Sequence, residues 1–409
     1  VLLPSREKQL LSAEGTLRQR GPVPSISFAV NTPRSKLVLS RRRKGHASSN
    51  MLWVDKHRPK SLDSLDVHPE LTTRLAAMSE DGEIPHLLFY GPAGSGKKTR
   101  VLALLKRIYG PGAERVRLEH RSFKTPSNRV VELTTVASNY HIEMSPGDAG
   151  IYDRYVVQDI IKEIAQSRSI SASMGGGGSD DKKSKIGHKV VVLVGVDRLT
   201  KQAQAGLRRT MERYTSSCRL ILLCHSPSKV IEPVRSRCLG VRVPAPSESE
   251  VCSVLTSVCR KESLTLPPAL AARVAKASKR NLRRAVLMIE ACRVQQYPFS
   301  EDQEVQMTDW ENYITQLARE VVLEQSPRRL LEAREKLYEL LTNCIPADVI
   351  LKTLTRELVK NLDCKLWGEV FKWAAFYEHR LHMGSKEILH LEAFVAKFMS
   401  IYKAYIIAE

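Results

Sequence analysis

The chain has 409 residues and a formal net charge of +20, from 64 lysines and arginines against 44 acidic residues. Hydrophobic residues make up 43% of it and charged residues 26%, which is typical of globular chains and excludes a peptide hormone, a lone binding module and wholesale disorder. No apolar run approaches the roughly 18 residues of a membrane span, so the sequence predicts a water-soluble protein with no membrane partner. The positive charge favours a polyanionic partner, and nucleic acid is the first expectation.

The first 50 residues differ from the rest, because they hold ten basic residues against two acidic ones and have no clear periodicity. Three interpretations compete: a disordered basic tail with a nuclear-import cluster at Arg41-Arg42-Arg43-Lys44, an organellar transit peptide, or translated sequence upstream of a start at Met51. We favour the third interpretation, because the first recognisable motif begins two residues after Met51.

Between residues 86 and 245, short apolar runs alternate with helix-like stretches. Strands are expected at 86–90, 116–118, 189–197, 219–225 and 239–243. This alternation predicts an α/β nucleotide-binding domain over residues 51–245, with a parallel, doubly wound sheet. Residues 169–185 are rich in glycine and polar side chains, so they are expected to form a flexible surface insertion.

Helical patterns follow the expected strands. Ser247 and Glu250 form a capping-box pattern that opens a small helical lid domain over residues 246–305. Residues 306–409 predict an all-α domain of about five amphipathic helices, with starts indicated at Thr308, Pro327, Pro346, Asp363 and Glu387. The final helix carries an apolar stripe from Ile388 to Tyr402, which fits a bundle core and a subunit interface equally well.

The eight cysteines show no spacing that is typical of zinc sites, and some lie in apolar stretches such as Leu220–Cys224. Reduced, buried thiols in a reducing compartment are therefore expected, and no structural metal.

The segment after the first expected strand reads Gly91-Pro92-Ala93-Gly94-Ser95-Gly96-Lys97-Lys98-Thr99, and a helix-like run follows it. A strand, a glycine-rich loop and a helix in this order form the context of a phosphate-binding P-loop. Glycines let consecutive backbone amides turn toward a phosphate, and the helix presents its positive end to the same anion. Lys97 would contact the β- and γ-phosphates, so all nine residues are candidate nucleotide ligands.

Three positions, in two segments, depart from the pattern of a hydrolytic site. The residue after the P-loop lysine, normally a Ser or Thr that ligates Mg²⁺, is Lys98, and Thr99 is rotated by about 100° from that position on a helix. The strand at 189–197 carries Val194 and Gly195 where two carboxylates would hold the metal and orient water. We therefore predict nucleotide binding without competent hydrolysis, and any Mg²⁺ would lack its usual ligands. In the alternative, Asp197 serves as the metal ligand of an active enzyme.

Four segments in order and spacing resemble the small subunits of replication factor C, the eukaryotic sliding-clamp loader of the AAA+ class: Trp53–Pro59, the P-loop, Leu207–Glu212 and Pro233–Cys238. The Lys-Lys-Thr ending of the P-loop, the missing acidic pair and residues 281–297 are similar to the subunit 3 branch, called subunit 5 in fungi. The resemblance covers about residues 51–409.

The resemblance implies an α/β ATPase domain, a helical lid, and a helical collar through which five subunits assemble into a ring. It implies ATP or ADP as the nucleotide, with Val54, Arg58 and Pro59 bordering the base and Arg283 sensing the nucleotide from the lid. Arg237 resembles the catalytic arginine finger that enters a neighbouring subunit's site. His225 stands where hydrolysing relatives carry a phosphate-sensing Asn.

The partners implied by the resemblance are four other replication factor C subunits, the sliding clamp PCNA and primer-template DNA in the nucleus. DNA contacts are expected at backbone phosphates, without sequence preference. Another AAA+ protein that remodels DNA remains an alternative, disfavoured because no added DNA-reading segment follows the collar.

Overall fold

The computed structural model describes residues 51–80, 84–124, 130–166, 188–215, 217–360, 362–384 and 386–408. The basic segment 1–50 and the expected insertion at 169–185 lie outside the described residues. Among the described helices, none combines the length and the apolar character needed to cross a bilayer. All eight cysteines are free thiols, but the predicted burial holds only in part: Cys218, Cys224, Cys259 and Cys292 are buried, whereas Cys344 and Cys364 are exposed.

One mixed sheet organises the α/β region of the described chain, in the order β2-β3-β4-β5-β6-β1-β7. Its strands are β1 (Leu87–Tyr90), β2 (Arg117–Lys124), β3 (Val130–Ala137), β4 (His141–Met144), β5 (Lys189–Val194), β6 (Cys218–Cys224) and β7 (Leu239–Arg242). Strands β4, β5, β6, β1 and β7 pair in parallel, whereas β2 with β3 and β3 with β4 pair antiparallel. The predicted α/β class is confirmed, with a sheet that is mostly rather than wholly parallel.

The antiparallel margin explains why two strands, β3 and β4, were missed. Strand β2 is long and polar, and it forms the edge of the sheet, so no apolar run reveals more than its start. In β3, exposed and buried residues are mixed along the strand, so its sequence lacks the continuous apolar run that is typical of a buried strand. The strand expected at 189–197 ends earlier, at Val194, because Gly195 adopts a left-handed conformation (φ 73°) and a short 3₁₀ turn, η6 (Val196–Arg198), follows.

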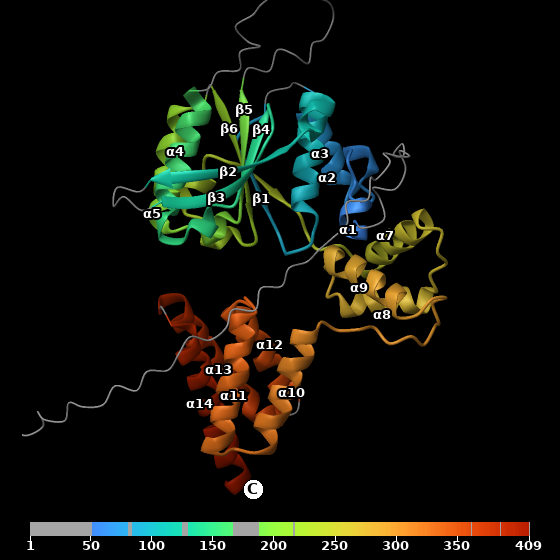
Figure 1. Cartoon of the computed structure of the whole chain (residues 1–409), viewed down its shortest axis with the longest axis vertical. Coiled ribbons are helices and arrows are strands. Elements are labelled where there is room, and N and C mark those ends of the chain that lie inside the picture. Colours follow the sequence, from blue (N-terminus) through green and yellow to red (C-terminus); the bar gives the residue numbers. More distant parts are fainter. Residues whose placement is uncertain are drawn as a thin grey trace, which may run out of the picture. The chain divides into compact units, whose positions relative to one another are not determined.

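Helices cover both faces of the sheet (Figure 1). On one face, α2 (Pro69–Met78) and α3 (Lys97–Tyr109) pack against strand residues such as Val192 and Leu223. On the other face, α4 (Asp153–Gln166) and α5 (Lys201–Arg213) pack against the alternate residues, such as Leu193 and Leu222. Successive strand residues point to opposite faces, so the central strands are apolar throughout.

Three helices after the sheet enclose a core of their own: α7 (Glu248–Lys261), α8 (Pro268–Ala277) and α9 (Leu282–Gln295). The predicted capping box opens α7, because the Ser247 hydroxyl accepts a hydrogen bond from the Glu250 amide (3.1 Å) and the Glu250 carboxylate accepts one from the Ser247 amide (2.7 Å). The short helix α1 (Trp53–Lys56) joins this core through the buried ring of Trp53, whose amide donates to the Glu290 carboxylate.

The last five described helices form a bundle: α10 (Asp309–Leu323), α11 (Pro327–Thr342), α12 (Ala347–Lys360), α13 (Cys364–Met383) and α14 (Glu387–Ala408). The predicted starts agree to within a residue, although the Thr308 hydroxyl bonds the Glu311 carboxylate (3.0 Å) and not a backbone amide. The apolar stripe of α14 packs inside this bundle, with Leu391, Phe394 and Val395 essentially inaccessible to solvent. Of the two interpretations of the stripe, the bundle core is the one observed.

Candidate functional site

The P-loop joins β1 to α3 and takes a shape that only glycine permits at two positions. Gly91 has a φ of 152°, and a Cβ there would lie 2.0 Å from the carbonyl oxygen of Val243. Gly94 has a φ of 74°, and a Cβ there would lie 1.8 Å from the side-chain oxygen of Asn281, at the start of α9. The loop is therefore held between the end of the sheet and the residue that caps a lid helix.

Lys97 begins α3 and is held against its own loop. Its Nζ donates hydrogen bonds to the carbonyl oxygens of Gly91 and Pro92, both at 2.7 Å, and its side chain is largely buried. Burial is the main cause that lowers the pKa of Lys97. The nearby Arg283 cation lowers this pKa further, and the carboxylate of Asp197 acts in the opposite direction and raises it. An ammonium fixed in this way at the start of a helix is arranged to meet an anion.

Two cavities meet at the P-loop. The first, which we call the strand-end cavity, lies between the loop and the ends of β5 and β6, and Val194, Gly195 and His225 are among its walls. The second, the lid cavity, has a volume of about 160 Å³ and lies between the loop, the α1 segment and helices α7 and α9. Residues 94–96, Thr99 and Arg283 line both. A molecule with an anionic chain and a flat apolar end would span the two.

The lid cavity has walls that suit a flat ring. Val54, Arg58 and Pro59 line one side, and Val254 and Val286 of the lid helices line another. The cavity thus combines apolar walls with polar and charged side chains such as Ser64, Asp66 and Lys261, which could fix the orientation of a ligand.

The α1 segment is anchored to the lid beside this cavity. The Glu262 carboxylate, at the end of α7, pairs with Lys56 Nζ (2.5 Å) and with the ring of His57. His57 is therefore a contact between α1 and the lid.

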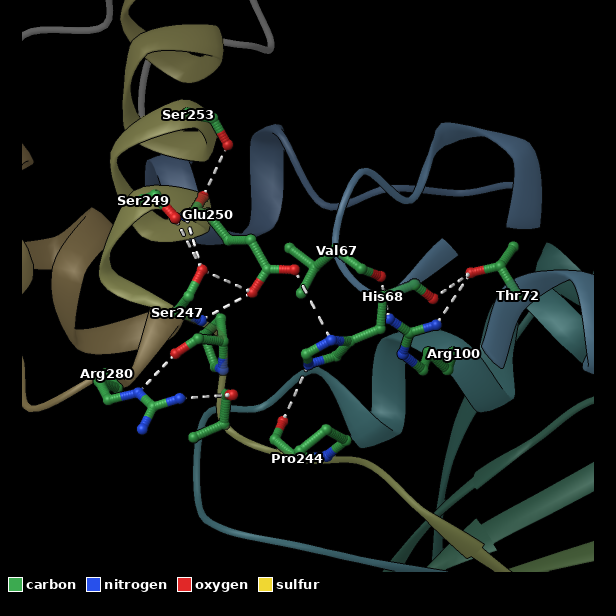
Figure 2. Close-up of polar contacts among 12 residues, drawn as sticks. Val67, His68, Thr72, Arg100, Pro244, Ser247, Ser249, Glu250, Ser253 and Arg280 are labelled. Atoms are coloured by element: carbon green, nitrogen blue, oxygen red, sulfur yellow. Dashed lines mark hydrogen bonds and ion pairs between the residues drawn. The ribbon is translucent and has the colours of Figure 1, made fainter. Parts of the chain in front are cut away.

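A polar network links α2, α3 and α7 beside the lid cavity (Figure 2), and two of its members, Val67 and Arg100, line that cavity. Arg100, only 2% exposed, donates to the Thr72 hydroxyl (3.0 Å) and to the Val67 carbonyl oxygen. The next residue, His68, has its two ring nitrogens 3.3 Å from the Pro244 carbonyl oxygen and 3.6 Å from the Glu250 carboxylate. This network joins the helix that follows the P-loop to the first helix of the lid.

The donor set around the strand-end cavity does not fit the Mg²⁺ site of a hydrolytic P-loop protein. Val194 and Gly195 line the cavity and carry no side-chain oxygen. Asp197 lies just beyond them, and its Oδ1 is buried with no hydrogen-bond partner among the described residues. Within the described ranges, no three His, Cys, Asp or Glu side chains are grouped so that they could hold a metal.

Position 98, which carries a metal-ligating hydroxyl in hydrolytic P-loop proteins, is occupied by a lysine that forms an ion pair. Lys98 lines the strand-end cavity, and its Nζ pairs with the carboxylate of Glu143, a largely buried residue of β4. No pattern in the sequence pointed to Glu143, because β4 was not predicted.

His225 lies where β6 ends, in the wall of the strand-end cavity. Its pKa is lowered, first by partial burial and then by the charges of Lys97 and Arg198. The ring is therefore neutral near pH 7, and a neutral imidazole keeps one N–H that is able to donate to a phosphate oxygen.

Arg237 lies outside both cavities, just after the short helix α6 (Glu232–Arg235). Its guanidinium pairs with the Glu212 carboxylate of α5 (2.5 and 2.8 Å) and donates to the Pro233 carbonyl oxygen (2.8 Å). About a third of the side chain (32%) is exposed. The hydrogen bond from Arg237 is the main reason that the pKa of Glu212 is lowered.

The structure thus brings together most of the residues singled out from the sequence. Val54, Arg58, Pro59, the P-loop from Ala93 to Thr99 and Arg283 line one or both cavities. Gly91 and Pro92 line neither cavity, but their carbonyl oxygens accept hydrogen bonds from Lys97. Arg237 lies outside both cavities. Sequence reasoning missed Arg100 and Arg198; for Arg100, the only available signal was its place in the first turn after the loop.

Three family models match successive parts of the chain. They are described as DNA polymerase III, delta subunit (residues 67–247), RCF1/5-like, AAA+ ATPase lid domain (253–294), and Replication factor C subunit 3, C-terminal domain (310–406). Among solved structures, the RuvB Holliday junction branch migration motor of Thermotoga maritima aligns with 16% identity and a TM-score of 0.44, over 74% of this chain and 90% of that chain.

Curated relatives match nearly the whole described chain. Replication factor C subunit 3 of Mus musculus is 56% identical over 354 residues, which are 87% of this chain and 97% of the relative. The Homo sapiens protein of the same name is 55% identical over the same shares, and the Arabidopsis thaliana protein is 54% identical over 88% and 99%. The chain therefore belongs to the replication factor C subunit 3 family of AAA+ clamp-loader proteins.

Proposed function

We propose that the chain is one of five subunits of a nuclear replication factor C complex, which loads the sliding clamp PCNA onto primer-template DNA during replication and repair. In this complex it binds ATP or ADP, hydrolyses it weakly or not at all, and lends Arg237 to the site of a neighbouring subunit. Residues 51–245, 246–305 and 306–409 act as the nucleotide-binding, lid and collar domains.

The proposal depends mainly on one observation: a formed nucleotide cradle beside strand ends that lack the catalytic oxygens. The P-loop, Lys97 and Arg283 supply the groups that bind a polyphosphate. Val194 and Gly195 supply neither a metal ligand nor a base for water. Loss of a positioned base alone costs about 10²–10⁴-fold in rate, so the site is suited to holding a nucleotide and not to cleaving it.

The position of Arg237 supports a role in a neighbour's site. It lies outside the cavities of its own chain, and its guanidinium is held by Glu212 while part of the side chain stays exposed. An arginine supplied from another subunit neutralises charge that develops on a transferring phosphoryl group, which is worth about 10³–10⁵-fold in rate.

The charge of the chain supports contact with DNA. A net charge of +20 attracts a polyanion, and contacts with backbone phosphates do not depend on sequence. We assign no individual residue to DNA.

The experiment uses a reconstituted five-subunit complex and measures ATP hydrolysis stimulated by DNA and the clamp. We expect Arg237→Ala to lower stimulated turnover far more than Lys97→Ala, because Arg237 serves another subunit's site and Lys97 serves a site that turns over little. Arg235→Ala is the matched control, since Arg235 ends the same short helix and forms its ion pair with Glu232. Equal losses from Arg237→Ala and Lys97→Ala would contradict the proposal.

A second candidate, an actively hydrolysing subunit, is favoured only by the unpartnered Oδ1 of Asp197. In that case the isolated chain would release phosphate from ATP, and both Lys97→Ala and Asp197→Asn would abolish the release.

A further inference from the structure

Lys98 occupies the position of the metal-ligating hydroxyl, and the structure gives this lysine a fixed place. Lys98 lies in the first turn of α3, next to Lys97, and it lines the strand-end cavity. Its ammonium pairs with Glu143, whose side chain is 11% exposed. Glu143 accepts one of the three N–H donors of that ammonium, so two donors remain for a ligand in the cavity.

Cations dominate the charged walls of this cavity. Lys97, Lys98, Arg198 and Arg283 line it, whereas two carboxylates oppose them among the described residues: Asp148 in the lining and Glu143, which pairs with Lys98. A polyphosphate placed there would meet side-chain cations on several sides. The charge that a divalent ion normally neutralises is therefore met by the chain itself.

The side chains that would hold Mg²⁺ in a hydrolytic P-loop protein are missing from this cavity. Val194 and Gly195 stand where two carboxylates would be, and Lys98 stands where a hydroxyl would be. We propose that Lys98, anchored by Glu143, takes the place of the divalent cation, so that this subunit binds a nucleoside di- or triphosphate without Mg²⁺. This inference rests on the proposed nucleotide binding and adds how the phosphates are held.

The test measures the affinity of the purified full chain for ADP and for ATP by calorimetry, in excess Mg²⁺ and in excess EDTA at one ionic strength. We expect the two dissociation constants to agree within about threefold, because the cationic walls replace the metal. This comparison needs no variant, so it does not depend on whether a mutant folds.

Variants then identify the responsible side chain. Lys98→Gln should weaken binding in EDTA by about tenfold to a hundredfold, the loss expected on removing one charge-assisted hydrogen bond. Lys98→Arg keeps the charge and should keep most of the affinity. Lys106→Gln is the matched control, because Lys106 lies on the same helix, pairs with Glu114 (2.7 Å) and does not line the cavity.

The outcomes separate this inference from the proposed function. Binding that requires Mg²⁺, or equal affinities of wild type and Lys98→Gln in EDTA, would overturn the role of Lys98 and leave nucleotide binding in place. Loss of Mg²⁺-dependent binding in Asp197→Asn would then assign the metal to Asp197. A chain that binds neither nucleotide in either buffer would overturn the proposed function itself.

Discussion

Single residues of the P-loop decide how closely the loop and the lid approach each other. Gly94 and Gly96 both have positive φ values, 74° and 85°. A Cβ on Gly94 would collide with the Asn281 side chain, whereas a Cβ on Gly96 would meet nothing within 4 Å. The two glycines therefore share a backbone requirement and differ in their contact with the lid.

That difference predicts unequal effects of alanine at the two positions. Each substitution should cost about 1–2 kcal/mol for the left-handed conformation. Gly94→Ala should cost more than Gly96→Ala, because Asn281 and the start of α9 must also move. Thermal unfolding of the two variants checks the ranking, and a larger loss in Gly96→Ala would contradict it.

A buried histidine at the start of β1 links stability to pH. His86 accepts a hydrogen bond at Nδ1 from the Leu220 amide (3.0 Å), so its proton is on Nε2. Burial lowers its pKa below the ordinary 6.5, and the Arg219 cation lowers it further. The folded chain therefore binds this proton less readily than the unfolded chain does.

The stabilising contribution of neutral His86 should be present above about pH 6.5 and lost as the pH falls through the lowered folded-state pKa. We expect the free energy of unfolding to fall less steeply between about pH 7.5 and pH 5 in His86→Asn, which keeps an acceptor, than in wild type. Denaturant titrations at several pH values measure the slopes. His120→Asn, at an exposed histidine, is the control, and equal slopes in wild type and His86→Asn would contradict the prediction.

At the scale of elements, helix α7 begins at a carboxylate with two functions. Glu250 completes the capping box with Ser247, and its other oxygen lies 3.6 Å from His68, at the start of α2 (Figure 2). One side chain therefore caps a lid helix and ties it to the segment beside the lid cavity.

The two functions are separable by substitution. Glu250→Ala removes both and should destabilise the start of α7 by about 1 kcal/mol, as other cap deletions do. Glu250→Gln keeps a capping oxygen and loses the charge, so it should cost only a few tenths of a kcal/mol. Hydrogen exchange at the first amides of α7 measures both, and equal protection loss in the two variants would show that the charge, not the cap, stabilises the helix.

At the scale of the whole molecule, the charge of +20 leads to a prediction for the salt dependence of DNA binding by the proposed complex. If the complex contacts about 6–10 phosphates, its DNA affinity should fall by about 10³–10⁵-fold between 50 and 200 mM salt. Fluorescence anisotropy with two primer-template duplexes of unrelated sequence provides the measurement. Affinities that differ strongly between the two sequences, or that resist salt, would contradict binding through the phosphate backbone.

Local signals in the sequence were enough to predict the P-loop and the helical bundle. Glycine spacing before Lys97 and the apolar periodicity of α14 both lie within short segments, so local chemistry determines them. The resemblance to a family added Val54, Arg58 and Pro59, which no local pattern indicated.

The remaining features depend on contacts between distant residues. Glu143 meets Lys98 from a strand in the mixed margin of the sheet, and Glu212 meets Arg237 across 25 residues. Trp53 contacts Glu290, 237 residues later. Periodicity and spacing carry no information about such pairs, so one sequence alone did not predict them.

The attachment of Trp53 to the lid has a mechanical consequence. The ring of Trp53 is enclosed by lid side chains, and the guanidinium of Arg293 lies 5.2 Å from its centre. The α1 segment, at the beginning of the described chain, is thus attached to lid helices more than two hundred positions later. If those helices moved, the α1 segment would move with them. The two walls of the lid cavity, formed by the α1 segment and by the lid helices, would therefore move relative to the P-loop as one rigid unit.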